Sequence, residues 1–122
     1  MLSILTVDDE TAFCKSMGEF LKRKGYKVRS SQSGKEALKS IDHEKPDIVF
    51  LDLLMPDMHG KDILREIKKR YHDIPIIMIT AINDAKKAIE LLIQGASDYL
   101  TKPVDFYYIE KYLSTWEKLS DV

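Results

Sequence analysis

Short, continuously apolar runs alternate with amphipathic stretches five times along the chain. The clearest run is Ile48–Leu51, in which every residue is apolar, as is typical of a strand covered on both faces. The stretches between the runs carry apolar residues at helical spacing and predict helices. The predicted strands are Leu2–Val7, Tyr26–Ser30, Ile48–Leu51, Ile74–Ile79 and Ser97–Thr101, and a helix follows each, the last from Val104 to about Leu119.

Strands that alternate with helices of this length predict an α/β fold with a parallel sheet covered by helices on both faces. The right-handed crossover rule then favours a single doubly wound, flavodoxin-like sheet of five strands in the order 2-1-3-4-5, flanked by five helices. A chain of 122 residues has room for one such core, so we expect one domain over residues 1–122. Gly25 and Gly95 are the predicted stops of the first and fourth helices.

Polar residues follow four of the five predicted strands. Asp8 and Asp9 come after the first strand, Asp52 after the third, Thr80 after the fourth and Lys102 after the fifth. In a doubly wound sheet the functional site lies outside the carboxyl ends of the strands. The sequence therefore predicts that these five side chains share one edge of the sheet.

Three carboxylates at one edge repel one another and raise each other's pKa values. A hard divalent cation removes that conflict, and an all-oxygen ligand set suits magnesium. With Lys102, the cation would stabilise the oxygens of a phosphoryl group during its transfer. Asp52 is the candidate nucleophile because it stands alone after the most buried strand, and carboxylates do form aspartyl phosphates. The Thr80 hydroxyl is placed to bond a phosphoryl oxygen.

At these residues the sequence resembles the receiver domains of response regulators in two-component signalling, over essentially its whole length. The matching stretches are Val7–Glu10, Asp52–Pro56 with Gly60 beyond it, Thr80–Ala81 and Gly95–Pro103. The resemblance implies a phosphoacceptor signalling domain and not an enzyme. It also implies a sensor histidine kinase or phosphotransfer protein as the phosphodonor, and an output domain or partner protein as the target.

The resemblance assigns a role to each residue of the set. Asp52 is implied to be the phosphorylation site. Asp9, Asp52 and the backbone carbonyl of Leu54 are implied to bind Mg²⁺ directly, and Asp8 to bind it through water. Lys102 is implied to pair with the phosphoryl group. The family's pattern also predicts a cis peptide bond between Lys102 and Pro103.

Two further residues are implied to report phosphorylation. Thr80 and Tyr99 match the pair whose coupled movement alters the surface formed by the fourth helix, the fifth strand and the fifth helix. Within the last helix, Tyr108 and Tyr112 lie off the stripe expected to face the sheet, and Leu91 lies off the apparent apolar face of the fourth helix. We therefore predict a partner or self-association surface there, including a phosphorylation-dependent homodimer. The alternative is that the tyrosines merely pack on a neighbouring helix.

The composition of the chain narrows its possible partners, location and function. The 19 basic and 20 acidic residues give a net charge of −1, which provides no footprint for direct nucleic-acid contact. One cysteine, no apolar run of membrane-spanning length and no signal-peptide pattern favour a cytoplasmic protein. The competing interpretation is a Mg²⁺-dependent phosphatase with an aspartate nucleophile, although its paired acids would lie two residues apart after the first strand. A flavin or nucleotide carrier would need a phosphate-binding loop in place of Asp8–Glu10.

Overall fold

A computed structural model describes residues 2–120 and contains a parallel sheet in the order β2-β1-β3-β4-β5. The elements in chain order are β1 Ser3–Val7, α1 Thr11–Arg23, β2 Lys27–Ser31, α2 Gly34–His43, β3 Ile48–Leu51, α3 Gly60–Arg70, β4 Ile76–Thr80, α4 Ala85–Ile93, β5 Asp98–Thr101 and α5 Phe106–Ser120. The predicted fold class and strand order are confirmed. The expected domain limits at residues 1 and 122 lie outside the described residues.

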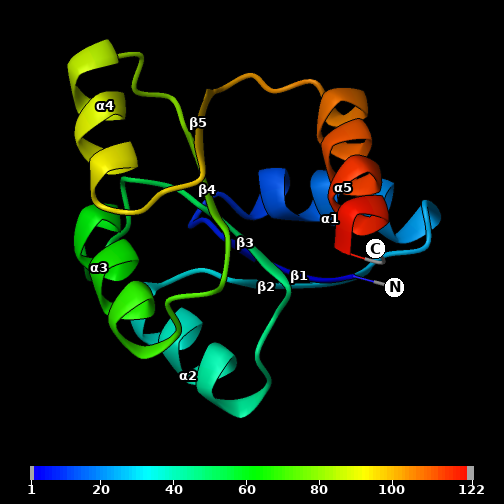
Figure 1. Cartoon of the computed structure of the whole chain (residues 1–122), viewed down its shortest axis with the longest axis horizontal. Helices are drawn as coiled ribbons and strands as arrows, with labels where there is room; N and C mark the ends of the chain where they lie inside the picture. The colour runs from blue at the N-terminus through cyan, green and yellow to red at the C-terminus, as the bar shows by residue number, and fades with distance from the viewer. Residues whose placement is uncertain (1, 121–122) are drawn as a thin grey trace.

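The sheet separates two apolar cores (Figure 1). Helices α1 and α5 cover one face, and α2, α3 and α4 cover the other. Strand β3 is buried along its whole length and supplies both cores in alternation, with Val49 and Leu51 on one face and Ile48 and Phe50 on the other. In residues 2–120, no helix has the length and apolarity needed to cross a membrane.

Two boundaries lie two residues from the prediction, and several others differ by one residue. Strand β4 begins at Ile76, two residues later than expected, because Pro75 has no N–H to donate to a neighbouring strand. Helix α5 begins at Phe106, where Asp105 caps the helix by accepting a hydrogen bond from the Tyr107 N–H at 2.9 Å. The two predicted helix stops are confirmed, since Gly25 and Gly95 both have positive φ angles.

The face assigned to α4 from the sequence is wrong. Leu91 is only 2% exposed and packs in the core, so it is not part of an exposed partner surface. The exposed apolar side chains of this helix are Ile89, Leu92 and Ile93. Apolar residues occupy most of the circumference of this nine-residue helix, so their spacing alone does not select the buried face.

Helix α5 carries a buried apolar stripe and, beside it, Tyr108 and Tyr112. Ile109 and Leu113 are buried against the sheet, whereas Tyr108 is 51% exposed. Tyr112 is half-buried and packs on the same core as Ile109. Tyr108 and Tyr112 line a groove of about 290 Å³ together with Trp116.

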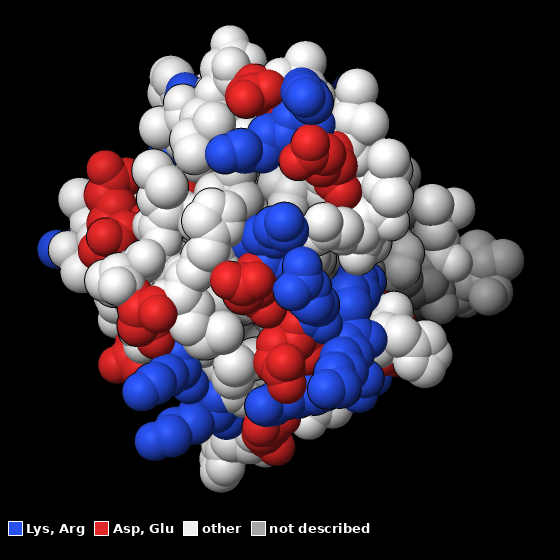
Figure 2. Space-filling view, turned by 90° about the vertical axis from the view of Figure 1, so that its left-hand side faces the viewer, with Lys and Arg blue, Asp and Glu red and all other residues white. Residues whose placement is uncertain are grey.

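Charged side chains on the face formed by α2, α3 and α4 are interleaved by sign (Figure 2). Near the ends of α2 and α3, Arg70 pairs with Asp42 at 2.7 Å and with Glu66 at 3.2 Å. Lys45 pairs with Asp73 at 2.6 Å. These pairs are exposed, so each contributes little to stability, about 0–1 kcal/mol.

Candidate functional site

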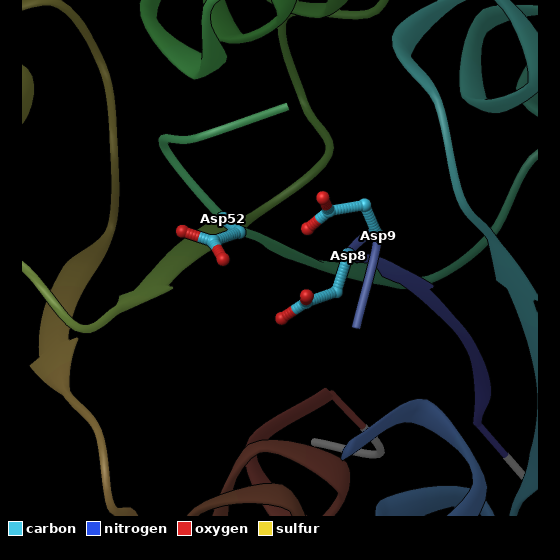
Figure 3. Close-up of side chains that lie close together, drawn as sticks. All are labelled: Asp8, Asp9 and Asp52. Carbon is cyan, nitrogen blue, oxygen red and sulfur yellow. The ribbon is translucent and has the colours of Figure 1, made fainter. Parts of the chain in front are cut away.

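The three acids predicted at the sheet edge come together in space. Asp8, Asp9 and Asp52 each offer a carboxylate oxygen, and these oxygens all lie within 4.8 Å of one another. Figure 3 shows Asp8 and Asp9, from the segment after β1, beside Asp52, which follows β3. Asp8 is 1% exposed and Asp52 7%, whereas Asp9 is exposed. Two of the three charges are therefore held away from water.

Backbone hydrogen bonds fix the acids at the ends of their strands. The Asp52 N–H donates to the Val7 carbonyl at 3.0 Å, which joins the segment after β3 to the end of β1. One carboxylate oxygen of Asp8 accepts a hydrogen bond from the Glu10 N–H at 2.9 Å. One carboxylate oxygen of Asp52 accepts from the Leu54 N–H at 3.3 Å, which leaves the other oxygen free of backbone contact.

Helix α3 packs directly on the loop after Asp52. The Gly60 N–H donates to the Leu53 carbonyl at 2.7 Å. A Cβ atom at position 60 would lie 2.5 Å from both the Asp52 carbonyl oxygen and the Leu53 Cα, a distance that forces the backbone apart. Glycine is required here for this close approach, and any side chain would displace the loop that carries Asp52 and Leu54.

Lys102 reaches the acids from the end of β5. Its Nζ lies 2.7 Å from Asp8, 3.2 Å from Glu10 and 3.4 Å from Asp52. Burial alone would lower the pKa of Lys102, but the hydrogen bond to Asp8 and the neighbouring carboxylates outweigh it and hold the pKa above its usual value. Burial raises the pKa of Asp8 despite that bond, and the charge of Asp52 adds to the effect. One ammonium does not balance this many acids.

Thr80 and Tyr99 meet at a single residue of the β4–α4 loop. The hydroxyl of the fully buried Thr80 accepts a hydrogen bond from the Ile82 N–H at 3.4 Å. The Tyr99 hydroxyl donates to the Ile82 carbonyl at 2.5 Å. The Lys102 N–H donates to the Thr80 carbonyl at 2.8 Å, and the predicted cis peptide bond between Lys102 and Pro103 is present.

Asp57 has a role that sequence reasoning missed. Its carboxylate accepts hydrogen bonds from the backbone N–H groups of Gly34 at 2.8 Å and Lys35 at 3.0 Å, at the start of α2. These bonds hold the pKa of Asp57 below its usual value. The residue therefore ties the loop after Asp52 to a helix distant in sequence. No local pattern signals such a contact, because the two partners lie more than twenty residues apart.

Residues 4–114 match the protein family described as the response regulator receiver domain. The chain belongs to this family. The phosphatase interpretation is thereby excluded, because a receiver domain is a phosphoacceptor signalling module of two-component systems and not an enzyme. The family also implies a cognate histidine kinase.

Curated relatives agree with this assignment and are longer than the chain. The response regulator MprA of Mycolicibacterium vanbaalenii is 39% identical over 82% of the chain, and the transcriptional regulatory protein ZraR of Escherichia coli is 38% identical over 86%. The matched regions make up 43% and 24% of those proteins, respectively. The receiver domain thus spans less than half of either relative.

Solved structures agree with the fold over almost the entire chain. A CheY-like receiver domain from Methanospirillum hungatei is 30% identical and superposes with a TM-score of 0.90, covering 99% of this chain and 95% of its own. A two-component response regulator from Clostridium difficile has a TM-score of 0.95 at 24% identity, with both chains covered completely, and supports the fold alone.

Proposed function

We propose that Asp52 of this receiver domain accepts a phosphoryl group from a histidine kinase or phosphotransfer protein, with Mg²⁺ bound, and that phosphorylation changes the binding surface at α4, β5 and α5. One observation carries the proposal. The Asp52 carboxylate is buried within 4.8 Å of two further carboxylates and 3.4 Å from the Lys102 ammonium. Such a site suits a cation and the oxygens of a phosphoryl group.

The donor set fits Mg²⁺, because three carboxylate oxygens lie within 4.8 Å of one another. Asp9, Asp52 and the Leu54 carbonyl would hold the ion directly, and Asp8 would hold it through water. When bound, the ion neutralises charge on the phosphoryl oxygens and relieves the repulsion among the acids. The raised pKa of Asp8, caused by burial and by Asp52, supports this reading, because the site disfavours its own negative charge.

In the transfer step, a carboxylate oxygen of Asp52 forms a bond to phosphorus as the bond from phosphorus to the donor imidazole nitrogen breaks. The electron pair of the broken bond stays with that nitrogen, and Asp52 becomes an acyl phosphate. Lys102 stabilises the charge on the transferring group. It already lies 3.4 Å from the Asp52 oxygen that is not bonded to the Leu54 N–H.

The switch follows from the bonds that meet at Ile82. If the Thr80 side chain rotates so that its hydroxyl donates to a phosphoryl oxygen, the hydroxyl oxygen moves away from the Ile82 N–H whose hydrogen bond it accepts at present. The loop before α4 then changes its conformation, and the Tyr99 hydroxyl loses a partner held in place by that loop. Thr80 and Tyr99 would in this way shift the population between two packings of the output surface.

The proposed output surface retains three of its four predicted residues. Tyr99, Tyr108 and Tyr112 lie on β5 and α5, and the exposed apolar side chains of α4 take the place of buried Leu91. This surface binds an output domain, a separate protein or a second phosphorylated copy of the chain. We place this receiver domain, over residues 1–122, in the cytoplasm. Its net charge of −1 argues against direct contact with nucleic acid by this domain.

Intact-mass measurement tests the acceptor. Incubation with acetyl phosphate and Mg²⁺ should add one phosphoryl group to the wild-type chain and none to Asp52→Asn, since an amide cannot form an acyl phosphate. Asp57→Asn is the matched control and should still be phosphorylated, because Asp57 bonds the start of α2. Equal incorporation in Asp52→Asn would overturn the assignment.

The output surface is tested separately. Replacing Tyr108 and Tyr112 with Ser should leave Asp52 phosphorylation intact while weakening phosphorylation-dependent dimerisation or partner binding. Aromatic side chains suit such contacts, because they bury a large area at low entropy cost. Analytical ultracentrifugation of the phosphorylated chain measures the dimer. Unchanged sedimentation and partner binding would show that the tyrosines only pack on α5 and its neighbours.

A further inference from the structure

The Lys102 ammonium also lies over an aromatic ring from α1. Its Nζ is 4.4 Å from the centroid of Phe13, well inside the range of about 6 Å over which a cation is attracted to a ring face. The other contacts of this ammonium among the described residues are with the carboxylates of Asp8, Glu10 and Asp52. Phe13 is thus an uncharged partner of the Lys102 ammonium.

We propose that Phe13 is a positioning residue of the acceptor site: its ring holds the Lys102 ammonium beside Asp52 and leaves the positive charge available to the phosphoryl group. This role rests on the proposed function of Asp52 as the acceptor. It assigns to α1 a direct part in preparing the site at the ends of β3 and β5.

A ring and a carboxylate hold an ammonium group in different ways. Asp8 and Glu10 bind Lys102 as anions, and a phosphoryl group must compete with them for the same charge. A bound cation would also draw Asp8 away from Lys102. The ring attracts the ammonium through its quadrupole and adds no anion, so this contact persists when the carboxylates change partners. The Lys102 side chain is only 15% exposed, so little water competes with the ring.

The ring itself is held in place by neighbouring aromatic residues. Phe106, the first residue of α5, contacts Phe13 edge to face, with ring centroids 6.2 Å apart. Phe106 also packs on Phe20 with centroids 5.6 Å apart. Lys102 is the first residue after β5, and Phe106 is the first residue of α5. Both contact Phe13. Figure 1 shows α1 beside α5, so α1 anchors the connection from β5 to α5 where it leaves the site.

Fluorination separates the electrostatic role of the ring from simple packing. Each added fluorine weakens the negative potential on the ring face while changing its shape very little, so a packing role predicts no change. Phe20 provides a matched control: its ring belongs to the same aromatic cluster and faces Lys24 at 5.5 Å, away from the acceptor.

The experiment places mono-, di- and trifluorophenylalanine at position 13 and, in separate proteins, at position 20. The rate constant of Asp52 phosphorylation by acetyl phosphate with Mg²⁺ and the melting temperature are measured for each. We expect the rate to fall stepwise along the Phe13 series, by about threefold to tenfold in total. The Phe20 series and all melting temperatures should stay level. Phe13→Leu should lose about as much as the trifluoro ring, and Phe13→Trp should keep the wild-type rate.

The results that overturn the proposal are distinct from those that overturn the acceptor. A phosphorylated wild type with a level or rising rate along the Phe13 series refutes the positioning role and leaves the role of Asp52 intact. An equal decline in the Phe20 series, or a rate that falls only in step with the melting temperature, refutes it as well. A wild type that takes up no phosphate refutes the acceptor function, and the role of Phe13 with it.

Discussion

Two of the charge clusters of this chain are built in opposite ways. At the carboxyl edge of the sheet, Asp8 and Asp52 are almost completely buried, and Lys102 is the cation that they share. Near the ends of α2 and α3, at the other end of the molecule, the acids are exposed. There Arg70 pairs with Asp42 and Glu66, and Lys45 with Asp73.

The contrast between exposed pairs and buried like charges distinguishes charges that serve stability from charges that serve function. Exposed pairs cost little to form and contribute little, so they need no further explanation. Buried like charges destabilise the folded state, and a protein retains them where a ligand or a reaction uses them. The excess of acids around Asp52 therefore agrees with the proposed site for a cation and a phosphoryl group.

Removing the cation from each region should affect the chemistry in only one of them. Lys102→Met should slow Asp52 phosphorylation by about 10²-fold, because it removes a donor aimed at the developing charge. Arg70→Met should leave the rate unchanged and cost less than about 1 kcal/mol of stability. Phosphorylation time courses by intact mass measure the rate, and denaturant titrations measure the stability. Equal effects of the two substitutions on the rate would remove the contrast.

Metal should stabilise only through the acids that follow β1 and β3. By mass action, Mg²⁺ at 100 times its Kd should add about 2.7 kcal/mol to the free energy of unfolding. Asp9→Ala should abolish most of this gain, whereas Asp42→Ala, in the exposed network, should retain it. Thermal melts with and without Mg²⁺ measure the shift. A melting temperature that does not change when millimolar Mg²⁺ is added would contradict the metal site.

When metal is absent, neutralising one acid should change the free energy of unfolding in opposite directions in the two regions. Asp52→Asn removes a charge that repels buried Asp8, so it should raise the free energy of unfolding by about 1 kcal/mol in chelator. Asp42→Asn weakens the exposed pair with Arg70 and should lower it by less than about 1 kcal/mol. Urea titrations in the presence of EDTA decide the signs, and a loss of stability in both variants would argue against strain at the acceptor edge.

The smallest effect concerns the tie between the acceptor loop and α2. Because the folded state lowers the pKa of Asp57 from 3.8, its contribution is present above that value and is lost as the pH falls through the lower folded pKa. Asp57→Ala should therefore destabilise the chain at neutral pH, by an amount that shrinks below about pH 4.

Ser33→Ala provides the control for this pH dependence. Its hydroxyl caps the same helix by accepting from the Glu36 N–H at 3.2 Å, but it does not titrate, so its cost should not change with pH. Denaturation midpoints at neutral and acidic pH compare the two variants. If the loss of stability caused by Asp57→Ala does not change with pH, the charge of Asp57 has no part in the cap.

The sequence alone determined the layered fold and the position of the acids. Apolar runs as short as Ile48–Leu51 favour strands covered on both faces, and their alternation with helices favours a parallel sheet. Parallel strands end at a common edge, so Asp8, Asp52 and Lys102 had to converge although they are far apart in the chain. The spacing of apolar residues is a local property, and the rules for connecting parallel strands are general. Both can therefore be applied to a sequence alone.

Tertiary structure alone decided which of several possible faces and partners each residue uses. Leu91 is buried because α4 packs with that side against the sheet, a choice its apolar circumference left open. Asp57 bonds the start of α2 and Phe13 lies under Lys102 through contacts between segments that no spacing rule relates. Such contacts depend on the relative positions of packed elements at the scale of a single side chain, which the pattern of a sequence does not encode.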